Sequence, residues 1–340
     1  MSGLSDALGR LVSGQRPSPA EIEAAVGDMM DGRGAPAEVA AFLTALRMRG
    51  EGVEEIVAAV RALRARAVRV AVDGPIVDTC GTGGDGLGTF NISTAAAFVA
   101  AAAGLRVAKH GNRAASGRVG AADVLEACGV RIEVGPAEAA SALERIGICF
   151  LFAPHYHPAF RHVAGVRREL GFRTLFNLTG PLCNPAGATR QVIGLFAREW
   201  LDVVAAAMAE LGTEHAMLVH GDDGSDEISV VAPTAVVELR DGRTERYEVR
   251  PGDFGFETCT IADLAGGDAR DNARILRSVL GGAPGPPARA VALNAGAAIY
   301  VGGGALSLEE GVRKARELLA SGQPLAKLDE LKRFTAGGQS

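Results

Sequence analysis

Residues 75–103 read PIVDTCGTGGDGLGTFNISTAAAFVAAAA, which is a strand-like apolar segment, a glycine-rich loop and an alanine-rich helical segment in succession. Glycines let the backbone approach a ligand closely, and the free N–H groups at a helix start can bind an anion. Ser93 and Thr94 add hydroxyl groups at that helix start. The order predicts an anion-binding loop, although a tight turn with a helix cap explains the glycines equally well. The spacing matches neither a Walker loop nor the dinucleotide fingerprint.

The rest of the chain after this loop alternates short apolar segments with alanine-rich helical ones. The apolar segments include residues 130–132, 191–196 and 216–219. This alternation is typical of an α/β domain with a mainly parallel central sheet. A long closing helix is predicted to begin at Ser307.

The first 73 residues carry helical signals instead. Ser18 and Glu21 form a capping-box pair with a proline between them, Pro36 can open a second helix, and residues 53–67 carry a third. We therefore predict a small N-terminal helical domain, residues 1–73, followed by a large α/β domain, residues 74–340. Residues 159–170 look helical and basic, and could be a helical excursion from the α/β domain.

Composition narrows the classes of partner. The net charge is −5 and the pI is near 5.8, which argues against a broad nucleic-acid-binding surface. The cysteines are odd in number and lack a CxxC pair, which favours reduced thiols over disulfides or zinc: Cys80, Cys128, Cys149, Cys183 and Cys259. The N-terminal residues lack the apolar core of a signal peptide, and the longest apolar run is too short to span a membrane. We expect a cytoplasmic protein with a small-molecule partner.

A second polar loop follows a strand-like segment at residues 107–117, VAKHGNRAASG. Its two fixed cations, Lys109 and Arg113, suit a phosphate. A solvated loop in which His110 is bonded locally is the alternative. Residues 121–126 then resume a helix.

Residues 220–227, HGDDGSDE, put four carboxylates within six residues. Hard cations such as magnesium take oxygen ligands, commonly one or two carboxylates plus substrate phosphates. Adjacent Asp226 and Glu227 would point to opposite faces of a regular strand. Both can therefore serve metal only from a loop, or by binding two different ions. A solvated acidic loop is the alternative.

A fourth segment combines PHYHP at residues 154–158 with VRRELGFRTLFNLTGPL at residues 166–182. Arginine offers a planar fork to a carboxylate, and prolines with apolar neighbours can wall a flat ring. Histidines in such a segment are more often structural than catalytic. The HxH pair also lacks the extra ligands of a zinc site.

Taken together, GTGGDG, NIST, KHGNR, ADVLEACGV, HP, VRRELGFRTLFNLTGPLCNP and DGSDEIS, in this order, resemble the anthranilate phosphoribosyltransferases of tryptophan biosynthesis. The likeness runs from about residue 10 to the end. It implies magnesium-assisted transfer of the phosphoribosyl group of 5-phosphoribosyl 1-pyrophosphate to the amine of anthranilate, giving N-(5-phosphoribosyl)anthranilate and pyrophosphate. It also implies a homodimer, and a helical domain to which residues 159–195 contribute.

The resemblance also implies roles for single residues. The donor would be held by Gly81, Gly84, Asp85, Thr89, Asn91, Ile92, Ser93, Thr94, Lys109, His110, Gly111, Asn112, Arg113, Ala114, Ala115, Ser116, Gly117 and Ala121. Anthranilate would contact Gly81, Asn112, His157, Arg167 and Pro181, and magnesium would contact Ser93, Asp226 and Glu227. Asn112, Arg167 and His110 would position the substrates, with no obligatory catalytic group, because an aromatic amine attacks through a free lone pair. The chain departs from the family pattern chiefly at Val119, where a serine is usual.

Two alternatives remain open. A pyrimidine nucleoside phosphorylase-like enzyme shares the fold and the transfer at an anomeric carbon, but the Asp226-Glu227 pair and the KHGNR segment argue against it. A non-catalytic nucleic-acid-binding relative would be expected to show a basic surface and an eroded glycine loop, whereas this chain is acidic and its loop is whole.

Overall fold

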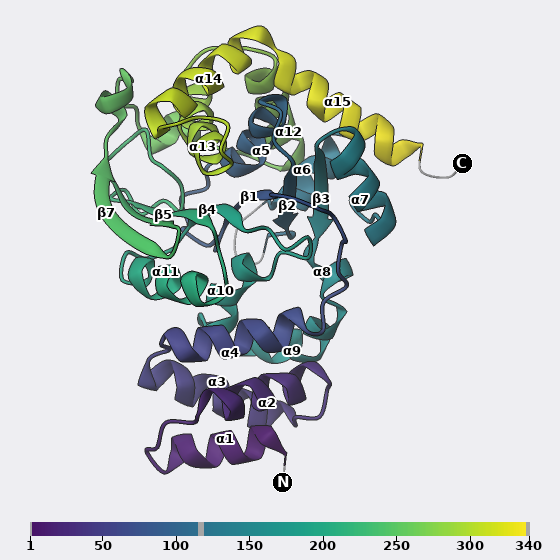
Figure 1. Ribbon diagram of the computed structural model, residues 1–340, viewed down its shortest axis with the longest axis vertical. Coiled ribbons are helices and arrows are strands. Elements are labelled where there is room, and N and C mark those ends of the chain that lie inside the picture. The colour runs from purple at the N-terminus through teal and green to yellow at the C-terminus, as the bar shows by residue number, and fades with distance from the viewer. Residues whose placement is uncertain (1, 115–118, 338–340) are drawn as a thin grey trace.

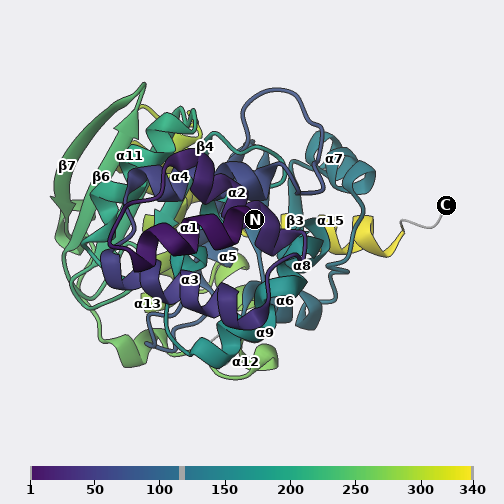
Figure 2. The same cartoon turned by 90° about the horizontal axis from the view of Figure 1, so that it is seen from below.

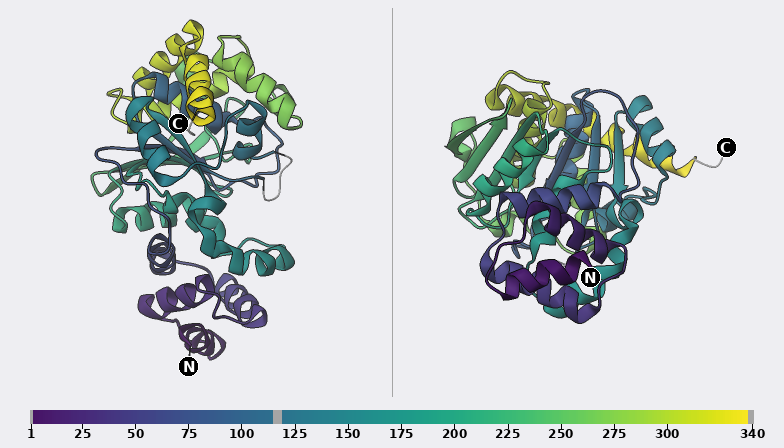
Figure 3. Two further views of the ribbon diagram at one scale, coloured as in Figure 1. Left: turned by 90° about the vertical axis from the view of Figure 1, so that its right-hand side faces the viewer. Right: turned by 60° about the horizontal axis from the view of Figure 1, so that its bottom comes forward.

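The computed structural model describes residues 2–114 and 119–337, which form a small N-terminal helical domain and a large α/β domain (Figure 1). The predicted fold class is confirmed. Figure 3 shows the helical domain below the sheet, with the C-terminal helices on the opposite side. None of the described helices is both long and apolar enough to cross a membrane.

The helical domain begins with the helices α1 (Gly3–Val12), α2 (Pro19–Met30), α3 (Pro36–Arg49) and α4 (Val53–Arg64). The capping box predicted at the start of α2 is present, because Ser18 and Glu21 each accept a hydrogen bond from the other's backbone N–H. Viewed from below, α1 lies in front of α2 and α3 (Figure 2). Ile22, Phe42 and Ile56 are fully buried where these helices meet.

One seven-stranded sheet forms the centre of the α/β domain. Its strands are β1 (Val77–Gly81), β2 (Val107–Gly111), β3 (Ile148–Phe152), β4 (Arg190–Gly194), β5 (His215–Gly221), β6 (Thr234–Arg240) and β7 (Arg243–Val249). Their order is β3-β2-β1-β4-β5-β6-β7, and the first five are parallel while β6 and β7 form an antiparallel edge. The switch in strand order falls between β1 and β4.

Apolar side chains cover both faces of this sheet, because successive strand residues point to opposite faces. Val192 of β4 joins the core on one side, and Ile193 joins the core on the other. The first side is covered by α5 (Ile92–Ala102), α6 (Ala121–Ala127), α12 (Ala269–Leu280), α13 (Pro286–Val301), α14 (Leu308–Ser321) and α15 (Gln323–Ala336). On the second side, α11 (Trp200–Glu210) lies between the sheet and α4 (Figure 1). α7 (Pro136–Arg145) precedes β3 and contacts it. The short helices η3 (Pro251–Phe254) and η4 (Ile261–Leu264) follow β7 in the chain.

Between β3 and β4 the chain leaves the sheet and returns to the helical domain. This excursion contains α8 (Ala153–Tyr156), η1 (Pro158–Phe160), α9 (Arg161–Leu170), α10 (Leu175–Thr179) and η2 (Gly180–Cys183). α9 contacts α2 and α3, and α10 contacts α3 and α4. Val163 and Phe176 enter the same core as Phe42. The helical excursion predicted from residues 159–170 is therefore present.

Two local predictions are wrong. Residues 130–132 do not form a strand, because Arg131 directs its backbone N–H and its Nε to Thr335 at the end of α15 instead of to a neighbouring strand. The closing helix from Ser307 is not continuous either. It breaks at Gly322, which has a left-handed φ of 72° and separates α14 from α15.

Two glycine substitutions test this explanation of the helix break, one at Gly322 and a control at Gly165. Gly322→Ala should lower the free energy of unfolding by about 1 kcal/mol, because an L side chain is strained at positive φ. Gly165→Ala should instead raise it by roughly 0.5–1 kcal/mol, since Gly165 lies inside α9 with open space around the Cβ position. Urea denaturation of both variants measures the difference. Equal effects would contradict this explanation of the break.

Candidate active site

Two glycines mark the floor of the candidate site. Gly81 and Gly194 end β1 and β4, and they pair in register at the point where the strand order switches. Open α/β sheets bind ligands at the carboxyl ends of their strands at such a point. A Cβ on Gly194 would lie 1.4 Å from the carbonyl oxygen of Asp226, and one on Gly81 would lie 2.5 Å from its Oδ2. Only glycine at both positions lets the acidic loop lie on the strand ends.

Asp226 and Glu227 face two different parts of the first quoted segment. They lie in the loop after β5 and not in a strand. Two adjacent carboxylates can serve one metal ion only from a loop, and this requirement is met. Asp226 Oδ2 accepts a hydrogen bond of 2.8 Å from the N–H of Gly83 in the glycine loop. Glu227 Oε1 accepts one of 3.1 Å from the N–H of Ser93 in the first turn of α5. The structure thus brings together the acidic loop, the glycine loop and a helix start.

The electrostatics of this pair fit a cation. Burial raises the pKa of both carboxyl groups, and repulsion raises them further, from Asp85 at Asp226 and from Asp226 at Glu227. Lys109 opposes part of the rise at Glu227. Carboxylate and hydroxyl oxygens are the ligands that magnesium prefers, so Asp226, Glu227 and the Ser93 hydroxyl suit it chemically. No cluster of three metal-ligating His, Cys, Asp or Glu side chains occurs among the described residues, so substrate oxygens would have to complete the coordination.

The other two carboxylates of the acidic loop do not point to the same place. Asp223 accepts hydrogen bonds from the hydroxyls of Ser225 and Ser229, at 2.8 and 2.6 Å, and so braces the loop internally. Asp222 forms an exposed ion pair of 3.3 Å with Arg198. Of the four carboxylates in this loop, only Asp222 has the exposed position that the solvated-loop alternative predicts.

The two cations of the KHGNR segment have different surroundings. Lys109 is 4% exposed, and its Nζ contacts the Thr79 carbonyl and lies 3.4 Å from Ser93 Oγ. Its charge therefore faces the helix start and the acidic pair. Arg113 instead forms ion pairs with Asp123, at 2.7 Å, and with Glu126. The structure places Lys109 with the anion-binding groups but holds Arg113 against carboxylates of α6.

The glycine loop is held in shape by residues distant in the sequence. Gly83 and Gly84 have left-handed φ values of 67° and 77°. Asp85 accepts a hydrogen bond from the N–H of Leu87, and Thr89 forms an isolated antiparallel bridge with Ala265. The return of the loop toward α5 is thus anchored to the segment after η4.

Polar groups without a partner lie at the start of α5. Among the described residues, the buried Asn91 Oδ1 and Thr94 Oγ1 have no hydrogen-bond partner, while Asn91 Nδ2 donates to the Val119 carbonyl at 3.4 Å. Ile92 between them is buried in the core. An unused amide oxygen and an unused hydroxyl suit sugar hydroxyls and phosphate oxygens. Val119 packs its side chain on the core, so its departure from the family pattern puts an apolar group there.

The imidazole rings of His110, in β2, and His157 lie next to each other. The rings of His110 and His157 are tilted, with centroids 5.2 Å apart. Burial lowers the pKa of His110 to about 3 and that of His157 to about 4, so both rings are uncharged at neutral pH. The Nε2 atom of each is buried without a partner among the described residues. Pro181, also buried, lies in the neighbouring η2.

Arg167 is a half-buried cation without an ion-pair partner in the described part of the chain. Its Cζ lies 5.8 Å from the ring centroid of Phe160 and 5.6 Å from that of Phe176. Burial lowers its pKa. A guanidinium supported by aromatic rings and free of carboxylates is available to a carboxylate ligand. Asn112, which follows β2, is exposed, and its Oδ1 accepts a hydrogen bond of 2.7 Å from the N–H of Arg113.

Three other predicted residues border this region, and three lie outside the description. Gly111 ends β2, Ala114 follows in the loop, and Ala121 begins α6. The donor contacts predicted for Ala115, Ser116 and Gly117 lie outside the described residues.

Sequence reasoning missed three buried polar residues. Asn294 of α13 holds the acidic loop, since its Oδ1 accepts from the N–H of Ile228 at 2.9 Å and its Nδ2 donates to the Ile228 carbonyl at 3.0 Å. Asn184 Nδ2 donates to Asp78 Oδ2 at 2.8 Å, and Asp78 Oδ1 accepts from the N–H of His110 at 3.1 Å. Asn294 stands in the apolar run AVALNAGAAI, and that isolation is the signal that could have marked it.

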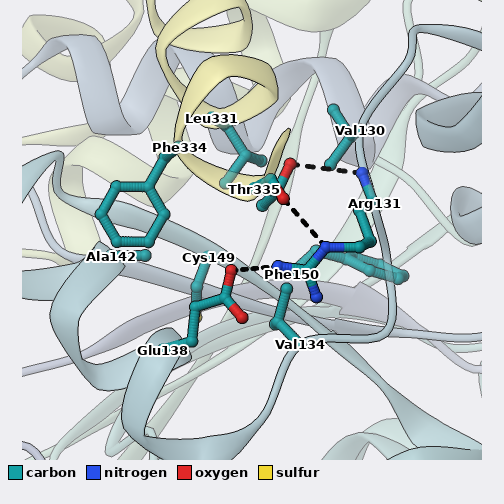
Figure 4. A pocket seen from close by; sticks show the side chains of 10 residues that line it. All are labelled: Val130, Arg131, Val134, Glu138, Ala142, Cys149, Phe150, Leu331, Phe334 and Thr335. Carbon is teal, nitrogen blue, oxygen red and sulfur yellow. Dashed lines mark hydrogen bonds and ion pairs between the residues drawn. The ribbon is translucent and has the colours of Figure 1, made fainter. Parts of the chain in front are cut away.

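A separate hollow lies under α15 at the β3 edge (Figure 4). Arg131 lies at this hollow and pairs with Glu138 and with the Thr335 carbonyl. Its polar groups are thus used internally, and none of the predicted site residues lines it.

Comparisons with known proteins identify the family of the chain. Residues 5–67 match the family described as "Glycosyl transferase family, helical bundle domain", and residues 73–325 match "Glycosyl transferase family, a/b domain". An anthranilate phosphoribosyltransferase from Rubrobacter xylanophilus is 53% identical, with 98% of this chain and 97% of that protein covered. One from Thioalkalivibrio sulfidiphilus is 50% identical, with 94% and 95% covered.

Solved structures give the same result. The crystal structure of anthranilate phosphoribosyltransferase from Thermus thermophilus superposes with a TM-score of 0.93 at 45% identity, covering 98% of this chain and 100% of that one. The Saccharomyces cerevisiae enzyme in complex with PRPP and Mg superposes with a TM-score of 0.89 at 28% identity, covering 98% of each chain. Since relatives about 50% identical over nearly the whole chain and a solved structure at 45% identity all carry this name, the chain belongs to the anthranilate phosphoribosyltransferase family.

Proposed function

We propose that the site at the ends of β1 and β4 carries out the reaction of this family. The enzyme transfers the phosphoribosyl group of 5-phosphoribosyl 1-pyrophosphate to the amine of anthranilate, giving N-(5-phosphoribosyl)anthranilate and pyrophosphate in tryptophan biosynthesis. The observation that carries the proposal is the convergence of the Asp226-Glu227 pair on the glycine loop and the start of α5.

The donor's phosphates would lie between the glycine loop and the first turn of α5. Ser93 and Thr94 supply hydroxyls, Lys109 supplies a buried positive charge, and Asn91 offers an unused acceptor to a sugar hydroxyl. The N–H groups of Gly83 and Ser93 are held by Asp226 and Glu227. Both become donors to phosphate once the two carboxylates turn away from them.

The chemical demand is greatest at the leaving group. When the bond from the anomeric carbon to pyrophosphate breaks, negative charge grows on the pyrophosphate, and fixed N–H donors and Lys109 stabilise it. A magnesium ion bound by Asp226, Glu227 and Ser93 would neutralise part of that charge. The chain needs no nucleophile of its own, because the aromatic amine carries a free lone pair.

The acceptor would be held on the side of α9. Arg167 would pair with the carboxylate of anthranilate, and Pro181 with the two neutral imidazoles would line the approach of its ring; the contacts of Arg167 with Phe160 and Phe176 support this role. Asn112 follows β2, the strand that carries Lys109, and would contact both substrates. Positioning of this kind lowers the barrier through entropy already lost on binding.

We also propose the finer points of organisation. Residues 1–73 with about 159–195 would form the helical domain and residues 74–340 the domain that binds the donor, supported by the contacts of α9 and α10 with α2, α3 and α4. A homodimer is proposed, supported by the exposed Val12 and Met48 on the helical domain. A cytoplasmic location is supported by five unpaired cysteines. Sedimentation of the purified chain would test the dimer.

A consumption assay tests the reaction itself. Anthranilate fluorescence should fall only when phosphoribosyl pyrophosphate and magnesium are both present, because the amine needs the donor and the donor's leaving group needs the cation. Cleavage of a pyrimidine nucleoside by inorganic phosphate, with no loss of anthranilate, would support the phosphorylase alternative. Nucleic-acid binding without any turnover would support the other.

The acceptor clamp predicts a selective defect. Arg167→Ala should raise the Michaelis constant for anthranilate by about tenfold to a hundredfold, the effect of losing a hydrogen-bonded ion pair. The constant for the donor should change far less. Arg167→Lys should recover only part of the loss, because lysine lacks the planar fork. Arg168→Ala, on the exposed side of the same helix, is the control. An equal effect on both substrates would contradict the clamp.

The metal edge predicts a shifted magnesium dependence. Asp226→Asn with Glu227→Gln should move the magnesium titration of turnover to higher concentration, whereas Asp222→Asn should leave it unchanged. Burial raises the pKa of both carboxyls above their values in the unfolded chain, so without a cation each lowers the free energy of unfolding as the pH rises above the unfolded pKa. The double variant should therefore melt at the same or a higher temperature without magnesium. An unchanged magnesium titration in the double variant would show that neither residue binds the metal.

A further inference from the structure

The turn between α9 and α10 lies between the two halves of the proposed site. α9 ends at Gly171, which has a left-handed φ of 67°, and α10 begins at Leu175. The acceptor clamp Arg167 lies on α9, one helical turn before the turn begins. Phe172 and Arg173, at the centre of the turn, are both exposed. An exposed arginine at this place invites the question of what it holds.

Arg173 contacts the glycine loop from the acceptor side. Its Nη2 donates a hydrogen bond to the carbonyl of Gly84, and its Cζ lies 4.1 Å from the ring centroid of Phe196. No carboxylate forms an ion pair with it in the described parts of the chain. Its charge is therefore used on a backbone carbonyl and an aromatic face.

The aromatic partner is itself tied to the same loop. The N–H of Phe196 donates to Thr82 Oγ1 at 2.9 Å, and the N–H of Thr82 donates to the Gly194 carbonyl at 2.8 Å. Arg173 thus meets the glycine loop twice, directly at Gly84 and indirectly through Phe196. Asp226 holds the neighbouring residue, Gly83, from the other side.

The other end of the connection leads to the acceptor clamp. Arg173 directly precedes Thr174, the N-cap of α10, whose N–H donates to Asn177 Oδ1 at 3.0 Å. Two residues further, Phe176 of α10 supplies one of the rings beside the guanidinium of Arg167, 5.6 Å away. Thr174 is bonded to Asn177 twice, because the N–H of Asn177 also donates to the Thr174 carbonyl at 2.8 Å. Only two residues separate Arg173 from Phe176, so a change in the position of Arg173 would be passed on to Phe176.

We propose that Arg173 is a positioning residue that couples the donor loop to the acceptor clamp. The inference rests on the proposed function, which places pyrophosphate at the glycine loop and the anthranilate carboxylate at Arg167. A donor that orders the loop also orders Arg173, and through Phe176 it lowers the cost of fixing Arg167 for the acceptor. Such coupling is reciprocal, so each substrate tightens the binding of the other by the same factor.

Binding measured without turnover tests the coupling. The probes are anthranilate, followed by its own fluorescence, and magnesium pyrophosphate, which occupies the donor loop but cannot react. The measured quantity is the ratio of the anthranilate Kd without pyrophosphate to that with saturating magnesium pyrophosphate. For the unaltered enzyme we expect a ratio of about five or more, the lower end of typical coupling. A merely structural role for Arg173 would change both Kd values and leave their ratio alone.

The variants separate the contact from the charge. Arg173→Met keeps an apolar chain over Phe196 but removes the donor, so the ratio should fall to about one, the value for uncoupled sites. Arg173→Lys, which keeps a charged donor, should recover part of it. Arg168→Met makes the same change at an exposed arginine whose side chain has no hydrogen bond or ion pair among the described residues, and should keep the full ratio. Melting temperatures confirm that each variant is folded.

Three outcomes would overturn the proposal: a ratio of one in the unaltered enzyme, an unchanged ratio in Arg173→Met, or an equal loss in Arg168→Met. Phe196→Leu provides a second route, since removing the ring should lower the ratio without touching the arginine. Failure of the proposed function is distinguishable, because the unaltered enzyme would then consume no anthranilate with the donor and magnesium present.

Discussion

The seating of the acidic loop on the ends of β1 and β4 is the contact on which the rest of this site depends. The carbonyl of Asp226 occupies the space that a side chain on Gly194 would need, and its carboxylate occupies the space beside Gly81. This seating places two carboxylates at the switch in strand order, where their burial raises the pKa of each. Burying two negative charges side by side is costly unless positive charge compensates them. Lys109 supplies some of it, and a divalent cation with its phosphates would supply the rest.

In the proposed site, the two substrates would be held by different parts of the fold. The donor groups come from the sheet and from α5, while Arg167 and its aromatic neighbours come from an excursion that packs on the helical domain. Such an arrangement requires the chain to leave the sheet after β3 and return at β4. The Arg173 contact crosses back from the excursion to the glycine loop. A change in the position of the excursion relative to the sheet would therefore alter this contact with the glycine loop.

Neutral and charged groups have distinct places in this site. The two imidazoles on the acceptor side are uncharged at neutral pH because burial lowers their pKa. In the proposed acceptor site, an anthranilate ring would therefore meet uncharged imidazoles. On the donor side the charges are concentrated, with Lys109 against the acidic pair. The separation suits one substrate that carries many negative charges and another that is mainly flat and apolar.

The sequence by itself determined the fold class, the glycine loop, the capping box at Ser18 and the family. The first three depend on local order and on periodicity along the chain, whereas the family came from the resemblance of several motifs in one order. It also identified Asp226, Glu227 and Arg167 as candidates, but it could not show that the acidic pair contacts the glycine loop and the start of α5, or that Arg167 lies against Phe160 and Phe176. The strand expected at residues 130–132 and the continuous closing helix were wrong, because hydrogen bonds to Thr335 and the left-handed Gly322 decided those segments.

Only the tertiary structure decided which charges are available. Arg113 looks as suitable for phosphate as Lys109 in the sequence, yet α6 presents two carboxylates that pair with it. The sequence assigned no role to Asn294, Asn184 or Arg173, and their hydrogen-bond partners lie 66, 106 and 89 residues away in the chain. A hydrogen bond between residues so far apart depends on how strands and helices pack, and no pattern of neighbouring residues records it.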